Sequence, residues 1–373
     1  MKSTYLIFGM LFLPFLLTAA ISKGQKDKAA KMNAIFREYD RQDVPGASVV
    51  VIKGGKVLFK KAYGSANLED KIPSTTSTNY RLASVTKQFT AMATMILAEQ
   101  KKLSYDDNLS DFFPDFPAYG KAITVRHLLN HTSGLIAYED VIPAGRTTPL
   151  TDQDVLQFMK QQDHTYFAPG SQFRYSNTGY VLLGLIVEKA SGNSFPEFLR
   201  ENIFEPLGMD GTVLYHRDDH RDRRRAYGYS QQGHAFLRTD QSLTSSTRGD
   251  GTVYSSVDDL YKWDQALYNT RLVSAETLKQ AFTPSASVSE TTGYGFGWFI
   301  ENKRGMRMIW HSGNTIGFTT LIQRFPDQAF TVIVQTNRNN DHLSEIVNKI
   351  EELYLFKKES LQPSPLAKTS LLK

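Results

Sequence analysis

The sequence predicts an α+β protein in which one antiparallel sheet takes strands from both ends of the chain and a mostly helical region lies between them. Runs rich in β-branched and aromatic residues cluster at 47–63 and again between 296 and 335, which is typical of strands. Between these clusters, apolar residues recur with helical spacing. Helices near both ends of the chain would cover one face of the sheet.

The expected N-terminal elements are a helix and a β-hairpin. A helix is predicted over 28–41, and β-rich runs follow at 47–52 and 57–63. The Lys-Gly-Gly-Lys segment at 53–56 separates these runs and is a turn signal. We expect this hairpin to pair with the late strands in one sheet.

The middle of the chain is expected to be helical. Residues 84–99 place Phe89, Met92, Met95 and Ile96 on one helical face. Further helices are predicted over 178–190, 195–203, 256–268 and 274–282, with short helices interrupted by prolines over 105–170. The polar segment 216–250 is expected to be irregular.

The last part of the chain supplies the remaining strands and a closing helix. β-rich runs lie around 296–301, 307–310, 318–324 and 330–335, and a helix is predicted over about 341–356. The sheet region therefore comprises about 28–80 and 285–356, the helical region about 84–284, and the whole domain 28–356. Residues 357–373, which contain two prolines, are expected to form a loose tail.

Composition restricts the class of protein. The chain has 373 residues, of which 41% are hydrophobic and 22% charged, so a disordered, collagen-like or polytopic membrane protein is excluded. The absence of Cys excludes disulfides, Fe–S clusters, thiolate zinc sites and a lipid-modified cysteine. The 43 Lys+Arg and 38 Asp+Glu give a net charge of +5, too weak an excess to indicate a nucleic-acid partner.

Residues 1–22 have the pattern of a secretory signal peptide. Lys2 supplies positive charge, residues 5–17 form an apolar run too short to span a bilayer comfortably, and the small residues at 18–20 suit cleavage. The alternative is an uncleaved N-terminal anchor. Both interpretations place the remaining chain outside the cytoplasm, periplasmic or extracellular, and cleavage would leave no stable membrane span.

The Ser-Val-Thr-Lys segment at 84–87 is the first candidate for chemistry. On a helix, the i,i+3 spacing places the Lys87 amine beside the Ser84 hydroxyl. Serine alone is a poor nucleophile, and a neighbouring amine can accept its proton. A helix that begins at Ser84 also presents backbone N–H groups to developing negative charge. The alternative is an N-cap serine beside a solvated lysine.

The Tyr-Ser-Asn segment at 175–177 is the second candidate. Tyr175 can act as a base when it lies near a lysine, and the Asn177 amide can hold a substrate carbonyl and the lysine together. The alternative is a turn that contains an N-capping residue.

The His-Ser-Gly segment at 311–313 is the third candidate, between two expected strands. A small residue and a glycine there allow a substrate backbone to approach closely. The backbone N–H just beyond could donate to an oxyanion. The alternative is a strand-end turn with a surface histidine.

With the three motifs in this order, the chain resembles the serine β-lactamase and penicillin-binding protein superfamily. The resemblance is strongest to the branch of class C β-lactamases, D-alanyl-D-alanine carboxypeptidases and D-aminopeptidases, the beta-lactamase-related serine hydrolases. It covers roughly residues 30–356 and implies a β-lactamase/transpeptidase-like fold. Supporting segments are Arg-Leu-Ala at 81–83, Leu-Leu-Asn-His-Thr-Ser-Gly at 128–134, Pro-Gly at 169–170 and Gly-Tyr-Gly-Phe-Gly-Trp at 293–298.

The resemblance implies a two-step acyl transfer that needs no metal or organic cofactor. Ser84 would be the nucleophile, and Lys87 and Tyr175 would share the general base and acid roles. The backbone N–H groups of Ser84 and Asn314 would form the oxyanion hole. Water would then release the acyl group.

The remaining motif residues would bind substrate. Asn177 would position substrate and lysine, and His311, Ser312 and Gly313 would line the site. Many β-lactamases carry Lys where this chain has His311. With an ordinary pKa of about 6.5, histidine is mostly neutral at pH 7, so it is a weaker anchor for a substrate carboxylate. If His311 is an anchor, affinity should fall as pH rises through its pKa.

The expected function is an exported serine hydrolase that acts on an amide or ester bond. Its partner would be a small-molecule or peptide substrate, including D-amino-acid-containing and cell-wall peptides. One alternative is a class C-like β-lactamase, and another is a non-catalytic sensor module that binds penicillin or peptidoglycan. The presence of Ser84, Lys87 and Tyr175 argues against the module.

Other clusters receive structural interpretations. His127 and His131 have the i,i+4 spacing of a helical metal pair, but without a His-Glu-x-x-His arrangement a helix end is favoured. The segment 216–225 alternates in charge sign and is interpreted as a solvated loop. Four aromatic residues could equally line a substrate cleft or pack under the sheet: Tyr294, Phe296, Trp298 and Trp310.

Overall fold

The computed structural model describes residues 23–214, 224–339 and 342–356. The expected signal peptide and the expected tail therefore lie outside the described residues, as does part of the segment expected to be irregular. Within the described ranges, no helix combines the length and the apolar character that crossing a membrane requires.

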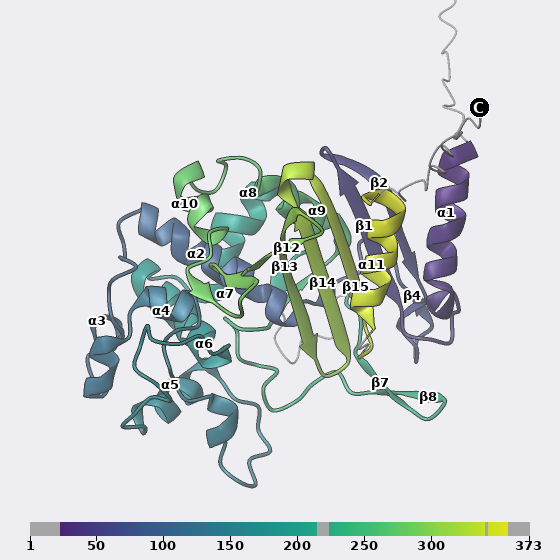
Figure 1. Cartoon of the computed structure of the whole chain (residues 1–373). Coiled ribbons are helices and arrows are strands. Elements are labelled where there is room, and N and C mark those ends of the chain that lie inside the picture. Colours follow the sequence, from purple (N-terminus) through teal and green to yellow (C-terminus); the bar gives the residue numbers. More distant parts are fainter. Residues whose placement is uncertain (1–22, 215–223, 340–341, 357–373) are drawn as a thin grey trace, which may run out of the picture.

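An antiparallel sheet of eight strands forms the centre of the described structure, in the order β10-β11-β12-β13-β14-β15-β1-β2 (Figure 1). Its strands are β1 (Ala47–Lys53), β2 (Lys56–Tyr63), β10 (Ala286–Ser287), β11 (Thr292–Tyr294), β12 (Phe299–Lys303), β13 (Met306–Thr315), β14 (Phe318–Phe325) and β15 (Phe330–Thr336). The predicted α+β architecture is confirmed, and the N-terminal hairpin pairs with β15, from Ala47 opposite Thr336 to Lys53 opposite Phe330.

Smaller strand pairs lie beside this sheet. β3 (Ser65–Asn67) pairs with β4 (Ile72–Pro73), and β9 (Val253–Ser255) lies between β5 (Tyr80–Arg81) and β6 (Val213–Leu214). β7 (Tyr229–Gln232) and β8 (Ala235–Arg238) form a hairpin. The expectation that 216–250 is irregular is therefore wrong for this part, because Gly233, with φ of +59°, permits a tight turn between two short strands.

The period of two in the strands divides the apolar side chains between two cores. On β1, Val49 and Val51 pack in one core, whereas Val50 and Ile52 pack in the other. The first core lies beneath α11, with Val347 and Ile350 among its members. The second core continues into the helical region. Both faces of the sheet are therefore buried.

The described α-helices are distributed over both faces of the sheet. They are α1 (Lys23–Ile35), α2 (Lys87–Glu99), α3 (Leu109–Phe112), α4 (Val125–Leu129), α5 (Asp152–Lys160), α6 (Asn177–Ser191), α7 (Phe195–Leu199), α8 (Glu205–Leu207), α9 (Val257–Ala266), α10 (Ala275–Ala281) and α11 (Leu343–Tyr354). Figure 1 shows α11 in front of the sheet, α9 behind it, and α2 to α7 gathered on one side.

Short helical turns are the remaining helical elements of the described residues. Five are 3₁₀ turns, η1 (Arg37–Tyr39), η2 (Ala83–Thr86), η3 (Ala118–Ala122), η4 (Tyr138–Val141) and η6 (Pro326–Gln328), and η5 (Arg200–Phe204) is a π-turn. The first predicted helix is divided into α1 and η1, since the helical pattern stops at Ile35. The next predicted helix is also divided, because 84–86 belong to η2 and the α-helix begins at Lys87.

Candidate active site

Ser84 lies on η2, between the sheet and the buried helix α2. The residue before it, Ala83, has a φ of +48°, a conformation that non-glycine residues rarely adopt and that is often found at functional sites. Side chains three residues apart are eclipsed in a 3₁₀ turn. Ser84 and Lys87 therefore point in the same direction, with 3.0 Å between Lys87 Nζ and Ser84 Oγ.

Lys87 is completely buried and has three hydrogen-bond acceptors. Its Nζ donates to Ser84 Oγ at 3.0 Å, to Asn177 Oδ1 at 2.9 Å and to the Asp250 carbonyl at 2.9 Å. All three acceptors are uncharged oxygens. The amine also lies 4.9 Å from the ring centroid of Tyr175. The solvated lysine of the alternative interpretation is thus excluded.

The second motif begins α6 and lies directly beside the first. The Ser176 side chain caps the helix by accepting from the Gly179 N–H at 3.2 Å. Asn177 bridges two groups, since its Oδ1 accepts from Lys87 and its Nδ2 donates to Glu139 Oε1 at 2.7 Å. Capping and site geometry are therefore both present, and the two interpretations of this motif are compatible.

Tyr175 precedes this cap and is half-buried. Its ring packs 4.3 Å from the ring of His131. Its hydroxyl oxygen is buried and has no hydrogen-bond partner among the described residues. A buried hydroxyl is normally paired, so this one is available to a bound molecule or to water.

The third motif lies inside β13 and not in a turn after a strand. The prediction ended this strand at 310, whereas β13 continues to Thr315. His311 is only 1% exposed. Its Nδ1 lies 2.6 Å from the Ser312 carbonyl and its Nε2 lies 3.2 Å from the Tyr294 hydroxyl. Because a carbonyl only accepts, Nδ1 carries the proton and Nε2 accepts from Tyr294.

The buried position of His311 determines its charge. Burial, together with the nearby Lys87 charge, lowers the pKa of His311 to about 3, against the Ser312 carbonyl contact that raises it. The imidazole is therefore neutral between pH 5 and 8. It cannot hold a substrate carboxylate as a cation, and the surface histidine of the alternative interpretation is also excluded.

Gly313 is required by the protein's own backbone. A Cβ at this position would lie 2.0 Å from the Leu82 carbonyl oxygen and 3.1 Å from the Ser84 nitrogen. The expectation was that this glycine lets a substrate approach. The structure shows instead that it lets β13 approach η2, so that Ser84 lies against the strand.

Ser312 and Asn314 lie on the other face of β13 from His311. Successive side chains on a strand alternate between faces, and Ser312 and Asn314 line a separate cavity together with Leu343 of α11. Their side chains therefore point away from Lys87. On the side of β12, pairing ends at Trp310, so the backbone of β13 from His311 onward has an unpaired edge among the described strands.

Three groups near the motifs were not identified from the sequence. His131, interpreted as part of a helix end, is fully buried with a φ of +60°, and its Nδ1 accepts from the Ser176 N–H at 3.1 Å. Burial chiefly, and then the Lys87 charge, place its pKa well below the ordinary value. The other two are the Asp250 carbonyl and the Glu139 carboxylate.

Signals for these groups differ in strength. The position of His131 beside an expected helix end gave no hint of its contact with Tyr175. A backbone carbonyl such as that of Asp250 leaves no trace in residue type. Glu139 is an exposed carboxylate on η4, and only the fold brings it to Asn177.

The four aromatic residues left open by the sequence are now placed. Tyr294, Phe296 and Trp298 are at most 2% exposed and belong to the interior. Trp310 is half-buried and stacks on Phe299, with ring centroids 4.6 Å apart. The described residues contain no group of three or more His, Asp or Glu side chains arranged to hold a metal ion.

Known proteins are similar to this chain along most of its length. The Beta-lactamase family profile matches residues 32–354. Penicillin-binding protein 4* of Bacillus subtilis (strain 168) is 34% identical over 350 residues, covering 89% of this chain and 77% of the Bacillus protein.

Solved structures of penicillin-binding protein homologues and amidases share the fold of this chain. The octameric penicillin-binding protein homologue from Pyrococcus abyssi superimposes with a TM-score of 0.77 and 31% identity, over 88% of this chain and 76% of that chain. The D-amino acid amidase from Ochrobactrum anthropi SV3, complexed with L-phenylalanine amide, gives 0.75 and 25% identity, over 88% of this chain and 97% of that chain.

Proposed function

The chain belongs to the Beta-lactamase family, and from this premise we propose that it is an exported serine hydrolase that forms an acyl-enzyme on Ser84. Its superfamily, that of the serine hydrolases, includes penicillin-binding proteins and D-amino acid amidases. The observation that carries the proposal is the buried Lys87 amine, which lies 3.0 Å from Ser84 Oγ.

The acceptors of Lys87 explain how it would activate the serine. A neutral amine has two N–H groups and one lone pair. In that form the Asn177 and Asp250 oxygens would keep the two N–H groups, and the lone pair would replace the N–H that Lys87 Nζ directs to Ser84 Oγ in the structure. The amine can then accept the hydroxyl proton as the Ser84 oxygen attacks the substrate carbonyl carbon.

Tyr175 would supply the proton that the leaving group needs. The bond between the carbonyl carbon and the leaving nitrogen or oxygen breaks as the Tyr175 hydroxyl proton reaches that atom. The Lys87 ammonium, whose Nζ lies 4.9 Å from the centroid of the Tyr175 ring, would then replace the proton on Tyr175. Water then attacks the acyl carbon and loses a proton to the same pair of residues. The bond between that carbon and Ser84 Oγ breaks, and the pair returns a proton to Ser84 Oγ as the carboxylic acid leaves. The unpaired Tyr175 hydroxyl supports this role.

The oxyanion would form between η2 and β13. The resemblance assigns its two donors to the N–H groups of Ser84 and Asn314, and the close approach at Gly313 brings these two backbone segments together. Two N–H groups that face developing negative charge stabilise an acyl-transfer transition state, each by roughly 3 kcal/mol.

Charge near the site favours a substrate with a free amine. Glu139 is an exposed carboxylate 2.7 Å from Asn177 Nδ2, and His311 is neutral. These groups would attract the ammonium of an amino-acid amide or ester and would not attract the carboxylate of a β-lactam. A D-amino-acid amide is therefore our first substrate, ahead of the class C-like β-lactamase alternative and of the non-catalytic sensor module.

We also propose the cellular context and boundaries of the enzyme. Residues 1–22 would direct export to the periplasm or the extracellular space, residues 28–356 would form the catalytic domain, and 357–373 would remain a tail. Within that domain, about 84–284 would form the helical region and the remaining residues the sheet region. Cell-wall peptides are the natural peptide substrates to test in that location.

The test is covalent labelling of Ser84. A fluorophosphonate probe and a penicillin are each mixed with the wild type and with two variants, Ser84→Ala and Ser370→Ala, and intact mass and drug consumption are followed. Ser370→Ala is the control, because Ser-Leu-Leu-Lys at 370–373 repeats the spacing of Ser84 and Lys87 in the expected tail. We expect labelling by the fluorophosphonate in the wild type and in the control, and none in Ser84→Ala. A folded wild type that takes up neither reagent and cleaves no ester or D-amino-acid amide would refute the proposal that the protein is a serine hydrolase.

Substrate class is tested with Glu139→Gln. Cleavage of a D-amino-acid amide is compared with that of its N-acetylated form. We expect the variant to raise KM for the free amine only. A lasting penicillin adduct in the wild type would point to a penicillin-binding peptidase, and rapid consumption of the drug to a β-lactamase.

A further inference from the structure

The third acceptor of Lys87 belongs to an irregular loop, residues 244–252, which precedes β9. On the side of α2, the loop is held by its carbonyl groups. Thr90 Oγ1 donates to the Gly249 carbonyl at 2.6 Å, and the Arg81 side chain donates to the carbonyls of Ser245 and Gly251, each at 3.1 Å. The Lys87 amine is bonded to this same row of carbonyls, so the position of the loop determines the position of the amine.

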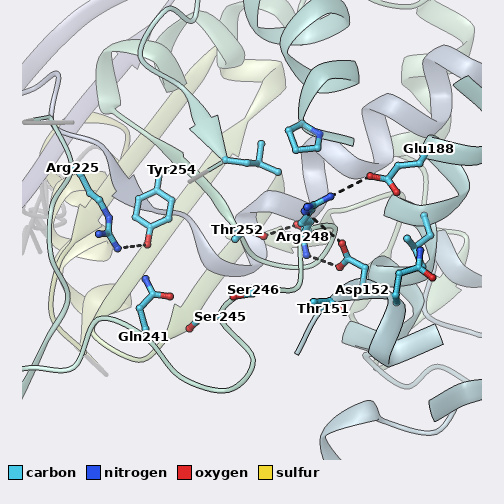
Figure 2. Close-up of a pocket in the computed structure, with 14 residues that line it drawn as sticks. Thr151, Asp152, Glu188, Arg225, Gln241, Ser245, Ser246, Arg248, Thr252 and Tyr254 are labelled. Carbon is cyan, nitrogen blue, oxygen red and sulfur yellow. Dashed lines mark hydrogen bonds and ion pairs between the residues drawn. The ribbon is translucent and has the colours of Figure 1, made fainter. Parts of the chain in front are cut away.

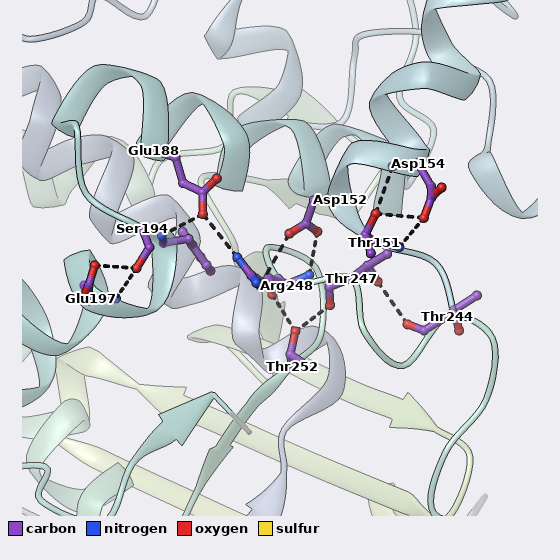
Figure 3. Close-up of polar contacts among 11 residues, drawn as sticks. Thr151, Asp152, Asp154, Glu188, Ser194, Glu197, Thr244, Thr247, Arg248 and Thr252 are labelled. Atoms are coloured by element: carbon purple, nitrogen blue, oxygen red, sulfur yellow. Dashed lines mark hydrogen bonds and ion pairs between the residues drawn. The ribbon is translucent and has the colours of Figure 1, made fainter. Parts of the chain in front are cut away.

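The opposite side of the loop is held by ionic groups. Asp152, the first residue of α5, accepts a hydrogen bond from the Arg248 backbone N–H at 2.8 Å, and its other oxygen lies 3.9 Å from Arg248 Nε. Arg248 Nη1 also lies 3.3 Å from Glu188 Oε1 on α6. Figure 3 shows Arg248 between these two carboxylates. We call Asp152 and Arg248 the clasp.

The clasp faces a cavity that is separate from the motifs. This cavity has a volume of about 300 Å³, and its lining includes Asp152, Glu188, Arg248 and Tyr254 but none of Ser84, Lys87 and Tyr175 (Figure 2). Asp152 is buried, whereas the Arg248 side chain is 33% exposed. Water in the cavity can therefore exchange protons with the clasp without entering the site of reaction.

We propose that Asp152 and Arg248 are positioning residues, which hold the 244–252 loop so that the Asp250 carbonyl orients the Lys87 amine toward Ser84. The inference rests on the proposed function, since it assigns a role to Lys87 in the reaction. Only one residue, Gly249, separates Arg248 from Asp250 along the backbone. Gly249 packs against the Tyr180 backbone, where a Cβ would lie 2.1 Å from the Tyr180 carbonyl oxygen. Movement at the clasp is thus transmitted directly to the carbonyl.

Asp152 makes the clasp sensitive to pH. Burial raises the pKa of its carboxyl to about 7, with Asp250 and Glu188 adding to the rise and Arg248 opposing it. Those three groups, from the loop and from α6, are the charged neighbours of Asp152, and across the cavity Arg225 is paired with Asp240. A protonated Asp152 no longer attracts the Arg248 guanidinium, so the clasp is strong above pH 7 and weak below it.

The decisive variant is Asp152→Asn, which keeps an oxygen for the Arg248 N–H and removes the charge. We expect the maximal rate of Ser84 labelling by a fluorophosphonate to fall about tenfold above pH 8, because misplacing a catalytic group by even 1 Å can reduce rates by as much as ~10²-fold. The probe concentration for half-maximal rate should not change. Below pH 6 the wild type and the variant should label at nearly the same rate.

A second variant and a matched control accompany it. Arg248→Gln, at a partly exposed side chain, should reproduce the loss above pH 8. Arg146→Gln breaks an ion pair of 2.9 Å with Asp154, also at the start of α5 but away from the loop, and should label like the wild type at every pH.

Stability separates positioning from a merely structural role. The folded state retains a proton on Asp152 up to about pH 7, whereas the ordinary value is 3.8. Burial of the charged form therefore opposes folding above pH 7. We expect Asp152→Asn to have an unchanged or higher Tm at pH 8. A structural role would lower Tm and leave the rate ratio independent of pH.

The outcomes distinguish this inference from the proposed function. A wild type that is never labelled refutes the function itself. Normal labelling of both clasp variants at every pH refutes the clasp and leaves the function intact. Failure of both variants to fold would also refute the clasp, because the pair would then serve the fold and not the position of the amine.

Discussion

Two buried basic side chains in this molecule, Arg324 and Lys87, differ in the groups that surround them. Arg324 on β14 is 1% exposed and forms an ion pair with the equally buried Asp264, with 2.7 Å between Nε and Oδ1. Lys87 is as deeply buried, but its three acceptors are uncharged oxygens. Both side chains lie near aromatic rings. Arg324 Cζ lies 4.6 Å from the centroid of the Tyr268 ring, and Lys87 Nζ lies 4.9 Å from the centroid of the Tyr175 ring.

This difference indicates a structural role for Arg324 and fits the proposed chemical role of Lys87. A charge fixed to a counter-ion in a low-dielectric interior is held in place by that partner. A proton shared among neutral oxygens can move without separating an ion pair. We therefore expect changes at Arg324 to affect stability and changes around Lys87 to affect the reaction.

The largest expected effect comes from removing the Lys87 amine. Lys87→Met should reduce the rate of Ser84 labelling by more than ~10³-fold, because the serine loses its proton acceptor. Tm should be unchanged or higher, since no carboxylate loses a hydrogen bond. Lys60→Met, at an exposed lysine paired with Asp258, is the control. A large fall in Tm for Lys87→Met would break the comparison.

Arg324→Met should give the next largest effect, which we expect in stability and not in the rate of labelling. It leaves Asp264 buried with its charge unbalanced, so the free energy of unfolding should fall by about 3–5 kcal/mol. Urea denaturation measures this. The double variant Arg324→Met/Asp264→Leu should recover most of the loss. Poorer labelling by the folded fraction of the single variant would argue against a purely structural role.

His311 sharpens the comparison because it is buried and neutral. Its folded pKa of about 3 lies below its ordinary 6.5, so the unfolded state binds more protons between these values and stability falls as pH drops below 6.5. Relative to His311→Asn, the wild type should lose about 2 kcal/mol between pH 7 and pH 5. The KM of the wild type should stay constant from pH 5 to 8. A rise in KM near pH 6.5 would instead support the hypothesis that protonated His311 holds a substrate carboxylate.

The smallest expected effect comes from removing one acceptor of Lys87. Asn177→Ala should lower the maximal labelling rate by roughly tenfold, because the amine loses part of its orientation. Half-maximal probe concentration and Tm should change little. Thr178 and Ser176 remain to start α6. An effect equal to that of Lys87→Met would mean that Asn177 itself takes part in proton transfer.

The sequence predicts those parts of the site whose spacing is local. Ser84 and Lys87 are three residues apart, and Asn177 begins a helix with a clear cap, so each could be placed before any coordinates were known. The β-rich runs at the two ends of the chain predicted that the N-terminal hairpin pairs with the late strands, and the structure identifies β15 as the partner of β1. The fold was therefore predictable from patterns that act over a few residues.

The rest depends on contacts that no local pattern encodes. The burial of His311 follows from the length of β13, which continues because β14 pairs with it as far as Thr315. Asp250 acts through its carbonyl, a group that every residue has. The β7–β8 hairpin was missed because its strands are only four residues long and mostly exposed, so they lack the alternation that identifies a strand.

The contact between Gly313 and the Ser84 turn has a consequence for synthesis. Ser84 and Lys87, the proposed nucleophile and its base, leave the ribosome early, whereas the strand against which they lie is completed more than 220 residues later, at Thr315. Until then the β1–β2 hairpin also lacks its neighbour β15. Under the proposed function, a nascent chain therefore cannot attack a carbonyl until nearly the whole domain has emerged. The time at which Ser84 first becomes labelled would then report when folding is complete.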